Sequence, residues 1–230
     1  MAPLAEVWVV APETQQSATS HAISLERPLR LRDLGDNRYA VDGTPTDCAH
    51  LAINHLLKDR RPDLTVTGIN QGPNLANDVA YSGTVAGAME SAILGVPAIA
   101  FSLATYRDFD FGPTARFARS LVQRALENLP EEPYVLNVNV PAGVDPDVYS
   151  ITRLGKHSYG NEVVKSTDPR GRPYYWIGGN DYTFEEIPGT DCHVVYGEKR
   201  ISVTPLHLDQ TAEPFLEQLS QWKITEFERA

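Results

Sequence analysis

Short apolar runs alternate with helix-length segments over residues 6–140, and this alternation is the strongest constraint on the fold. The runs at 6–11, 64–69, 96–103 and 134–140 are rich in Val, Ile, Leu and Ala, and each has the length of a strand. Nearly continuous apolar runs are typical of strands that are buried on both faces of a parallel sheet. The pattern therefore predicts an α/β fold with a Rossmann-like, doubly wound parallel sheet.

Three segments between or after these runs carry helix signals. One begins at Thr44, which can cap the helix, with Pro45 at the first helical position and Asp47 near the positive end. A second begins near Gly83, and its apolar face is expected to consist of Val85, Ala88, Met89, Ala92 and Ile93. A third spans about 114–129, and we expect it to pack through Phe117, Leu121, Val122 and Ala125.

The chain changes character after residue 141, where Gly, Pro, Asp and aromatic residues become frequent, as in the run DPRGRPYYWIGG. We expect residues 1–141 to form the core that carries the binding loops. We expect residues 142–230 to form an irregular extension, rich in β-hairpins, that mediates association between copies. Within the extension we predict a strand at 201–205. We also predict a helix at 211–222 that buries Phe215, Leu219 and Trp222.

Composition argues against several classes of function. The chain has a net charge of −10 and no more than two adjacent basic residues, so we expect no binding to long nucleic acids, which requires a basic stripe. No apolar stretch approaches the roughly 18 residues of a membrane span, so we expect no membrane partner. Cys48 and Cys192 lack the spacing of a metal or redox site, and we expect two free thiols in a cytoplasmic protein.

Three polar loops are expected to meet at one edge of the sheet, because ligands of α/β folds bind at the carboxyl ends of the strands. The first follows the first apolar run and offers Ser17 and His21. The second follows the next run and contains Asn70 and Asn74. The third, Ser82-Gly83-Thr84, opens a helix whose unpaired amides and dipole favour an anion. These loops hold neutral oxygens and few charges, which suits a small phosphorylated ligand.

Each of these residues also has a simpler interpretation. Ser82 can be simply the helix cap, with no ligand to bind. Asn70 and Asn74 can be turn residues, and Ser17 can be a plain loop serine. We expect His21 to form hydrogen bonds rather than bind a metal, because no second His or Cys stands at ligand spacing. Spacing alone leaves these alternatives open.

Six stretches, taken together and in order, resemble the SurE family of survival proteins, which act as 5'/3'-nucleotidases. They are VVAPETQQSATSHAIS, VDGTPTDCAH, TGINQGPN, YSGTVAGAMES, VLNVNVP and VTPLHLD, and they extend from about residue 6 to about residue 209. The resemblance implies a metal-dependent phosphatase that hydrolyses nucleoside monophosphates on a Rossmann-like core. It also implies a homodimer or homotetramer formed by exchange of C-terminal elements.

The resemblance further implies roles for individual residues. Ser17 and Asn70 look like the family's ligands to a divalent metal ion, for which Mg²⁺ or Mn²⁺ is expected. Asn74 and the turn of Ser82, Gly83 and Thr84 look like phosphate-binding residues. Tyr81 stands where the family often has His. No side-chain nucleophile is identified, and water is expected to attack the phosphorus in line.

The sequence departs from the family pattern at its start. The family begins with a strand ending in Asn-Asp-Asp-Gly, whose aspartates are the charged metal ligands, and this motif does not occur here. The corresponding strand would lie between those at 6–11 and 64–69. Carboxylates dominate the binding of hard divalent cations, so we expect impaired catalysis. Two explanations compete. One is a misplaced start of translation. The other is a true short variant that has lost catalysis and instead binds nucleotide or phosphate, or assembles.

Overall fold

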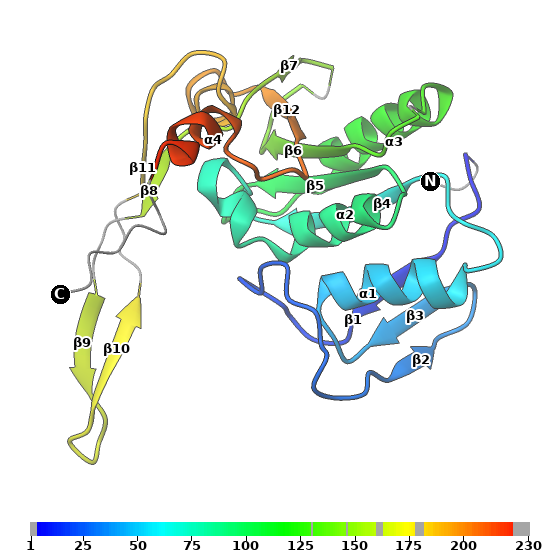
Figure 1. Ribbon diagram of the computed structural model, residues 1–230, viewed down its shortest axis with the longest axis horizontal. Coiled ribbons are helices and arrows are strands. Elements are labelled where there is room, and N and C mark those ends of the chain that lie inside the picture. Colours follow the sequence, from blue (N-terminus) through cyan, green and yellow to red (C-terminus); the bar gives the residue numbers. More distant parts are fainter. Residues whose placement is uncertain (1–3, 130, 146, 160–162, 178–181, 223–230) are drawn as a thin grey trace.

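The computed structural model describes residues 4–129, 131–145, 147–159, 163–177 and 182–222, and its strands form two main sheets (Figure 1). The larger sheet has five strands, in the order β4 (Thr65–Gln71), β5 (Ala98–Ala104), β6 (Val135–Pro141), β12 (Ile201–Leu206) and β7 (Tyr149–Ile151). Strands β4, β5 and β6 run parallel, whereas β12 is antiparallel to β6 and parallel to β7. The α/β prediction with a parallel sheet is confirmed, with a mixed portion at one side.

The smaller sheet contains the first strand of the chain. Strand β1 (Val9–Pro12) is parallel to β3 (Arg38–Val41), and β2 (Leu31–Asp33) is antiparallel to β3. Within the described ranges β1 pairs only with β3 and β4 pairs only with β5, so no strand joins the two sheets. The packing of α1 (Pro45–Leu51) on α2 (Gly83–Ile93) connects them instead.

Helix α1 begins as predicted. The Thr44 hydroxyl accepts a hydrogen bond from the Asp47 amide at 3.1 Å, and the Asp47 carboxylate accepts one from the Thr44 amide at 2.9 Å. This reciprocal capping box satisfies two backbone donors that the helix itself leaves unpaired. A short π-helical turn, η1 (Ala52–Leu56), continues the helix.

Helices cover both faces of β5. Its residues Ala98 and Ala100 face α2, where Val85, Ala88 and Ala92 are buried. Its residues Ile99 and Phe101 face α3 (Gly112–Glu127). The α3 side chains packed there are Phe117, Leu121, Val122 and Ala125. This two-sided packing explains why β5 is apolar at nearly every position.

Three predictions of burial are wrong. Strand β1, expected to be buried on both faces, contains no buried residue, and Val9 is 45% exposed. Ile93, expected on the buried face of α2, is 59% exposed at the last position of the helix. Strand β4, expected to be buried on both faces, alternates instead, with Val66 40% exposed. Its position at the edge of the five-stranded sheet leaves part of it without a covering layer.

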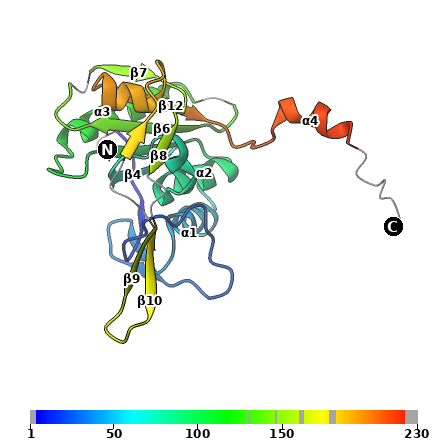
Figure 2. The ribbon, with the colours of Figure 1, turned by 90° about the vertical axis from the view of Figure 1, so that its left-hand side faces the viewer.

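The C-terminal extension is rich in hairpins, as predicted. Strands β8 (His157–Tyr159) and β11 (Tyr182–Phe184) form one antiparallel pair. Strands β9 (Val163–Thr167) and β10 (Pro173–Ile177) form another, which projects from the body in both views (Figures 1 and 2). Both β12 and β7 of the extension belong to the five-stranded sheet. No helix in the described ranges is long and apolar enough to span a bilayer.

The terminal helix contradicts its predicted burial. Helix α4 (Glu213–Ser220) stands away from the rest of the chain in Figure 2, and it contains no buried residue. Phe215 is 40% exposed, Trp222 is 56% exposed, and Leu219 is only half-buried. The rings of Phe215 and Trp222 meet edge to face, with centroids 5.7 Å apart. The apolar face therefore exists as the sequence predicts, but no other described part of this chain covers it.

Candidate functional site

The loop after β4 crosses the carboxyl ends of β5 and β6, where side chains of both strands bind its backbone. The Asn74 amide donates to Asn139 Oδ1 at 2.8 Å, and the Asn74 carbonyl accepts from the side-chain amides of Asn137 at 2.7 Å and Asn139 at 3.0 Å. Asn74 Nδ2 donates to Ser102 Oγ at 2.7 Å. Asn74 is 6% exposed, so in this structure it anchors the loop, and its predicted contact with phosphate stays a prediction.

Three residues of this anchor were not singled out by sequence reasoning. Asn137, Asn139 and Ser102 are fully buried polar side chains in strands that are otherwise apolar. A signal was present in the run Leu-Asn-Val-Asn-Val, where two asparagines two positions apart lie on the same face of a buried strand. Buried amides require partners, so such a pair predicts a polar element lying across that face.

The end of β4 lies beside the start of α2. Thr84 Oγ1 is 3.4 Å from Asn70 Oδ1, and Asn70 Nδ2 donates to the Gly72 carbonyl at 3.0 Å. The Thr67 hydroxyl donates to the Thr84 carbonyl at 2.8 Å. Asn70 and Thr84, predicted as a metal ligand and a phosphate-binding residue, are therefore neighbours. The Thr84 hydroxyl donates to the side-chain oxygen of Asn70.

Ser82 caps α2. Its hydroxyl accepts from the Val85 amide at 3.1 Å, and its carbonyl accepts from the Ala86 amide at 2.9 Å. The capping interpretation is thus confirmed. Neither bond uses the amides of Gly83 and Thr84, which are the donors that an anion at this helix start would meet.

The loop that carries Ser17, which we call the 16–21 loop after its residues, lies against the same helix start. A Cβ atom on Gly83 would be 2.8 Å from Thr19 Oγ1, 3.1 Å from Pro45 Cγ and 3.3 Å from the Gln16 carbonyl oxygen, so a side chain there would require the loop to shift. The Ser20 amide donates to the Tyr81 carbonyl at 3.0 Å. Ser17 itself is exposed, and its hydroxyl accepts from Gln15 Nε2 at 3.0 Å. The structure therefore brings two of the three predicted loops into contact at α2, and Asn70 joins them through Thr84.

His21 forms hydrogen bonds, as predicted. Its Nε2 is 2.9 Å from the Glu90 carboxylate on α2. Glu90 is 8% exposed, and His50 of α1 contacts its other oxygen at 2.9 Å. Sequence reasoning missed Glu90 and His50, which are separated from His21 along the chain and carry no spacing signal.

The carboxylates nearest to these loops in the sequence already have partners. Glu13 pairs with Arg32 at 3.0 Å, and Asp78 lies 3.4 Å from His157 Nδ1. Asp47 serves the α1 cap and also accepts from the amide and hydroxyl of Ser24 at 2.9 and 2.8 Å. Burial alone would raise the pKa of Asp47, but the hydrogen bonds from Ser24 and Thr44 outweigh it and hold that pKa below its ordinary value.

The described part of the chain contains no group of three or more His, Cys, Asp or Glu side chains arranged to hold a metal ion. Ser17 and Asn70 would contribute two neutral oxygens. Hard divalent cations depend on carboxylates for affinity, so these two residues alone are poor ligands for such an ion.

Both cysteines are buried and unpaired, as predicted. Burial raises the pKa of the Cys48 thiol to about 12, and the charge of Asp47 adds to this effect. Burial, together with Asp191, raises the pKa of Cys192 to about 12. Neither thiol is therefore an activated nucleophile.

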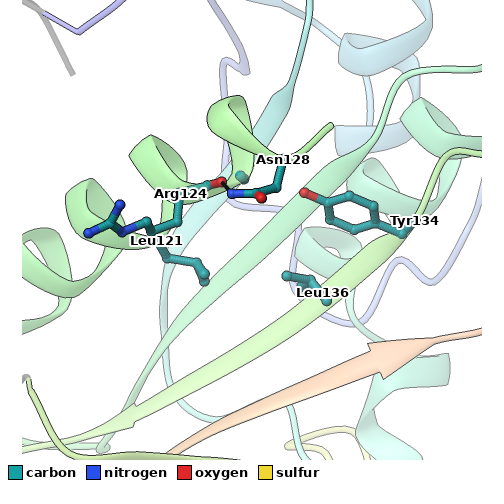
Figure 3. Close-up of a pocket in the computed structure, with 6 residues that line it drawn as sticks. Leu121, Arg124, Asn128, Tyr134 and Leu136 are labelled. Carbon is teal, nitrogen blue, oxygen red and sulfur yellow. Dashed lines mark hydrogen bonds between the residues drawn. The ribbon is translucent and has the colours of Figure 1, made fainter. Parts of the chain in front are cut away.

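Of two hollows on the described surface, one lies near these loops. A hollow of about 410 Å³ lies where α3 ends and β6 begins, at the opposite end of the parallel strands from these loops (Figure 3). Its lining is mostly apolar, with Leu121, Tyr134 and Leu136 facing the gap. The second, of about 450 Å³, lies between His21, the outer face of α2 and the 3₁₀ turn η2 (Ala76–Ala80).

Comparisons with known proteins give matches over most of the chain. The family model "Survival protein SurE" matches residues 1–161. The 5'-nucleotidase SurE of Myxococcus xanthus (strain DK1622) is 62% identical over 229 residues, covering 100% of this chain and 87% of that protein. The 5'-nucleotidase SurE of Anaeromyxobacter dehalogenans (strain 2CP-C) is 55% identical, covering 97% and 88%. The crystal structure of the SurE protein from Aquifex aeolicus superposes with a TM-score of 0.78 at 39% identity, covering 92% of this chain and 86% of that one.

Proposed function

The chain belongs to the SurE family, and from this premise we propose that it acts on nucleoside 5'- or 3'-monophosphates, releasing nucleoside and phosphate. The observation that carries the proposal is the meeting of Asn70, Thr84 and the 16–21 loop at the start of α2. A compact group of neutral donors at a helix start suits a phosphate ester.

The phosphoryl group would bind at the start of α2. The amides of Gly83 and Thr84 can donate to its oxygens, and the helix dipole favours its charge. The anchored Asn74 fixes the loop beside them, so these donors are held in place before the substrate arrives. Because no described side chain is positioned as an activated nucleophile, attack by water is the simplest route.

The SurE family is generally dependent on a divalent metal ion. For this chain we expect Mg²⁺ or Mn²⁺, with Ser17 and Asn70 as neutral ligands. These two side chains alone are poor ligands for such an ion, and the nearby carboxylates of Glu13, Asp47 and Asp78 are held by other partners. We therefore propose that catalysis by this chain is impaired, whereas phosphate binding is retained.

The same observation favours a second candidate, a nucleotide- or phosphate-binding protein without catalysis. Calorimetric titration with AMP, in the presence and absence of Mn²⁺, separates the two. An impaired enzyme binds AMP more tightly with Mn²⁺, and Asn70→Ala removes that gain. A binding module shows the same affinity with and without the metal. Absence of AMP binding under both conditions would refute both candidates.

We also propose that the chain forms a homodimer or homotetramer through residues 142–230. Support comes from the exposed apolar side chains of α4 and of the β9–β10 hairpin. Phe215, Leu216, Trp176 and Ile177 are all at least 40% exposed. An isolated hairpin is marginally stable in water, and an uncovered apolar helix face favours association. Light scattering should give a lower mass for a variant lacking residues 211–230, and an unchanged state of association would refute α4 as a contact.

The proposed location is the cytoplasm. It rests on two cysteines that stay unpaired, as expected in a reducing compartment. The proposed partner is a nucleoside monophosphate, and neither a nucleic-acid polymer nor a membrane is proposed as a partner.

A further inference from the structure

A buried carboxylate on α2 lies outside the phosphate-binding donors and contacts two imidazoles. Glu90 is 8% exposed, His21 Nε2 lies 2.9 Å from its Oε2, and His50 Nδ1 lies 2.9 Å from its Oε1. A carboxylate withdrawn from water needs a hydrogen-bond donor at each oxygen, and these two rings supply them.

The network extends beyond Glu90 through the second nitrogen of His50. Asn54 Nδ2 lies 3.2 Å from His50 Nε2. Glu90, His21, His50 and Asn54 therefore form one continuous set of polar contacts, in which each Glu90 oxygen faces one imidazole nitrogen.

These contacts join three segments that surround the candidate site. Glu90 is on α2, His50 is on α1, and His21 ends the 16–21 loop that lies against Gly83. Two residues of the loop have an unfavourable backbone conformation, which contacts from outside the loop can stabilise. Ala18 and Ser20 have φ values of 55° and 52°, a left-handed conformation that is unfavourable for residues other than glycine.

We propose that Glu90 is a positioning residue, which holds the 16–21 loop on the start of α2 by binding His21. This inference rests on the proposed function, since the loop is where Ser17 and Thr19 would approach a substrate phosphate. His50 orients the carboxylate from the opposite side. Loss of Glu90 leaves the loop with its Ser20–Tyr81 backbone bond and its later attachments of Ala22 and Ser24 to the α1 cap.

Hydrogen–deuterium exchange of the amides in residues 16–24, read by mass spectrometry in the full chain, tests the proposal without requiring activity. Glu90→Gln and His21→Leu should each accelerate exchange there by about tenfold, because the loop opens more often. The double variant should be no faster than either single variant, because both remove the same contact. His21→Gln places an amide donor near the position of Nε2 and should restore slow exchange.

Glu127→Gln provides the matched control, since Glu127 is a carboxylate paired with Arg124 at 2.8 Å on the exposed face of α3. Exchange in residues 16–24 should be unchanged in that variant. The proposal is overturned if Glu90→Gln behaves like Glu127→Gln, or if the effects of Glu90→Gln and His21→Leu add. It is also overturned if His21→Gln fails to restore protection.

Nucleotide affinity completes the test. Glu90→Gln and His21→Leu should weaken AMP binding about tenfold or more, and His21→Gln should recover most of it. If the unaltered chain binds no AMP, the proposed function fails, and the exchange pattern still decides whether Glu90 holds the loop. If AMP binds and all variants bind it equally, Glu90 has no positioning role in the site.

Discussion

Replacing Asn139 with Leu should destabilise the chain more than replacing Asn137 with Leu. Asn139 makes two bonds to the loop, accepting from the Asn74 amide at 2.8 Å and donating to the Asn74 carbonyl at 3.0 Å. Leucine leaves the Asn74 amide buried without an acceptor, which costs about 1–3 kcal/mol, while the carbonyl retains its bond from Asn137. Adding the lost second bond, we expect the free energy of unfolding to fall by about 2–3 kcal/mol.

Asn137→Leu is a control on the same strand and the same face. It removes one bond to the Asn74 carbonyl, but it also removes Asn137 Oδ1, a buried acceptor without a hydrogen-bond partner in the described part of the chain. The two effects oppose each other, so the free energy of unfolding should change by no more than about 1 kcal/mol. Urea unfolding of both variants measures the difference. Equal losses, or a larger loss for Asn137→Leu, would refute the proposed anchoring of the loop by Asn139.

Three further outcomes are expected. Asp47→Asn should lower stability at pH 7 by about 1–2 kcal/mol. Because the folded pKa of Asp47 is lowered, its contribution is present above the unfolded pKa of about 3.9 and is lost as pH falls through the folded pKa, so urea midpoints of variant and parent should converge in acid. Cys48 and Cys192 should not react with a thiol reagent at pH 8 until urea unfolds the chain, and fast labelling of the folded chain would contradict their burial. Gly83→Ala should weaken AMP binding about tenfold through the clash with Thr19, and unchanged affinity would refute close approach of the loop.

Short-range sequence rules predicted which segments form the helices and strands of the core, but not which of their side chains are exposed. The capping box of α1 and the two-sided burial of β5 follow from short-range chemistry and from the length of apolar runs. The exposure of Val66 does not, because the position of β4 at a sheet edge depends on which strands pair. The exposure of Phe215 and Trp222 likewise depends on what covers α4, which periodicity cannot specify.

The candidate site shows the same division. Loops at the carboxyl ends of strands were predicted to meet, and Thr84 does lie beside Asn70 while the 16–21 loop contacts Gly83. The distant residues that hold these loops in place were not predicted. Asn139 reaches Asn74 across 65 positions, and Glu90 reaches His21 across 69, so no local pattern links the members of either pair.

Phosphate release from AMP tests the central claim most directly, with this chain and the Myxococcus xanthus relative assayed side by side at equal Mn²⁺ concentration. The proposed function predicts slow release by this chain, slower than by the relative, which stops with EDTA and falls sharply in Asn70→Ala. Release that is as fast as in the relative would contradict the proposed impairment. Release that survives both EDTA and Asn70→Ala would contradict the placement of the metal and phosphate at the start of α2.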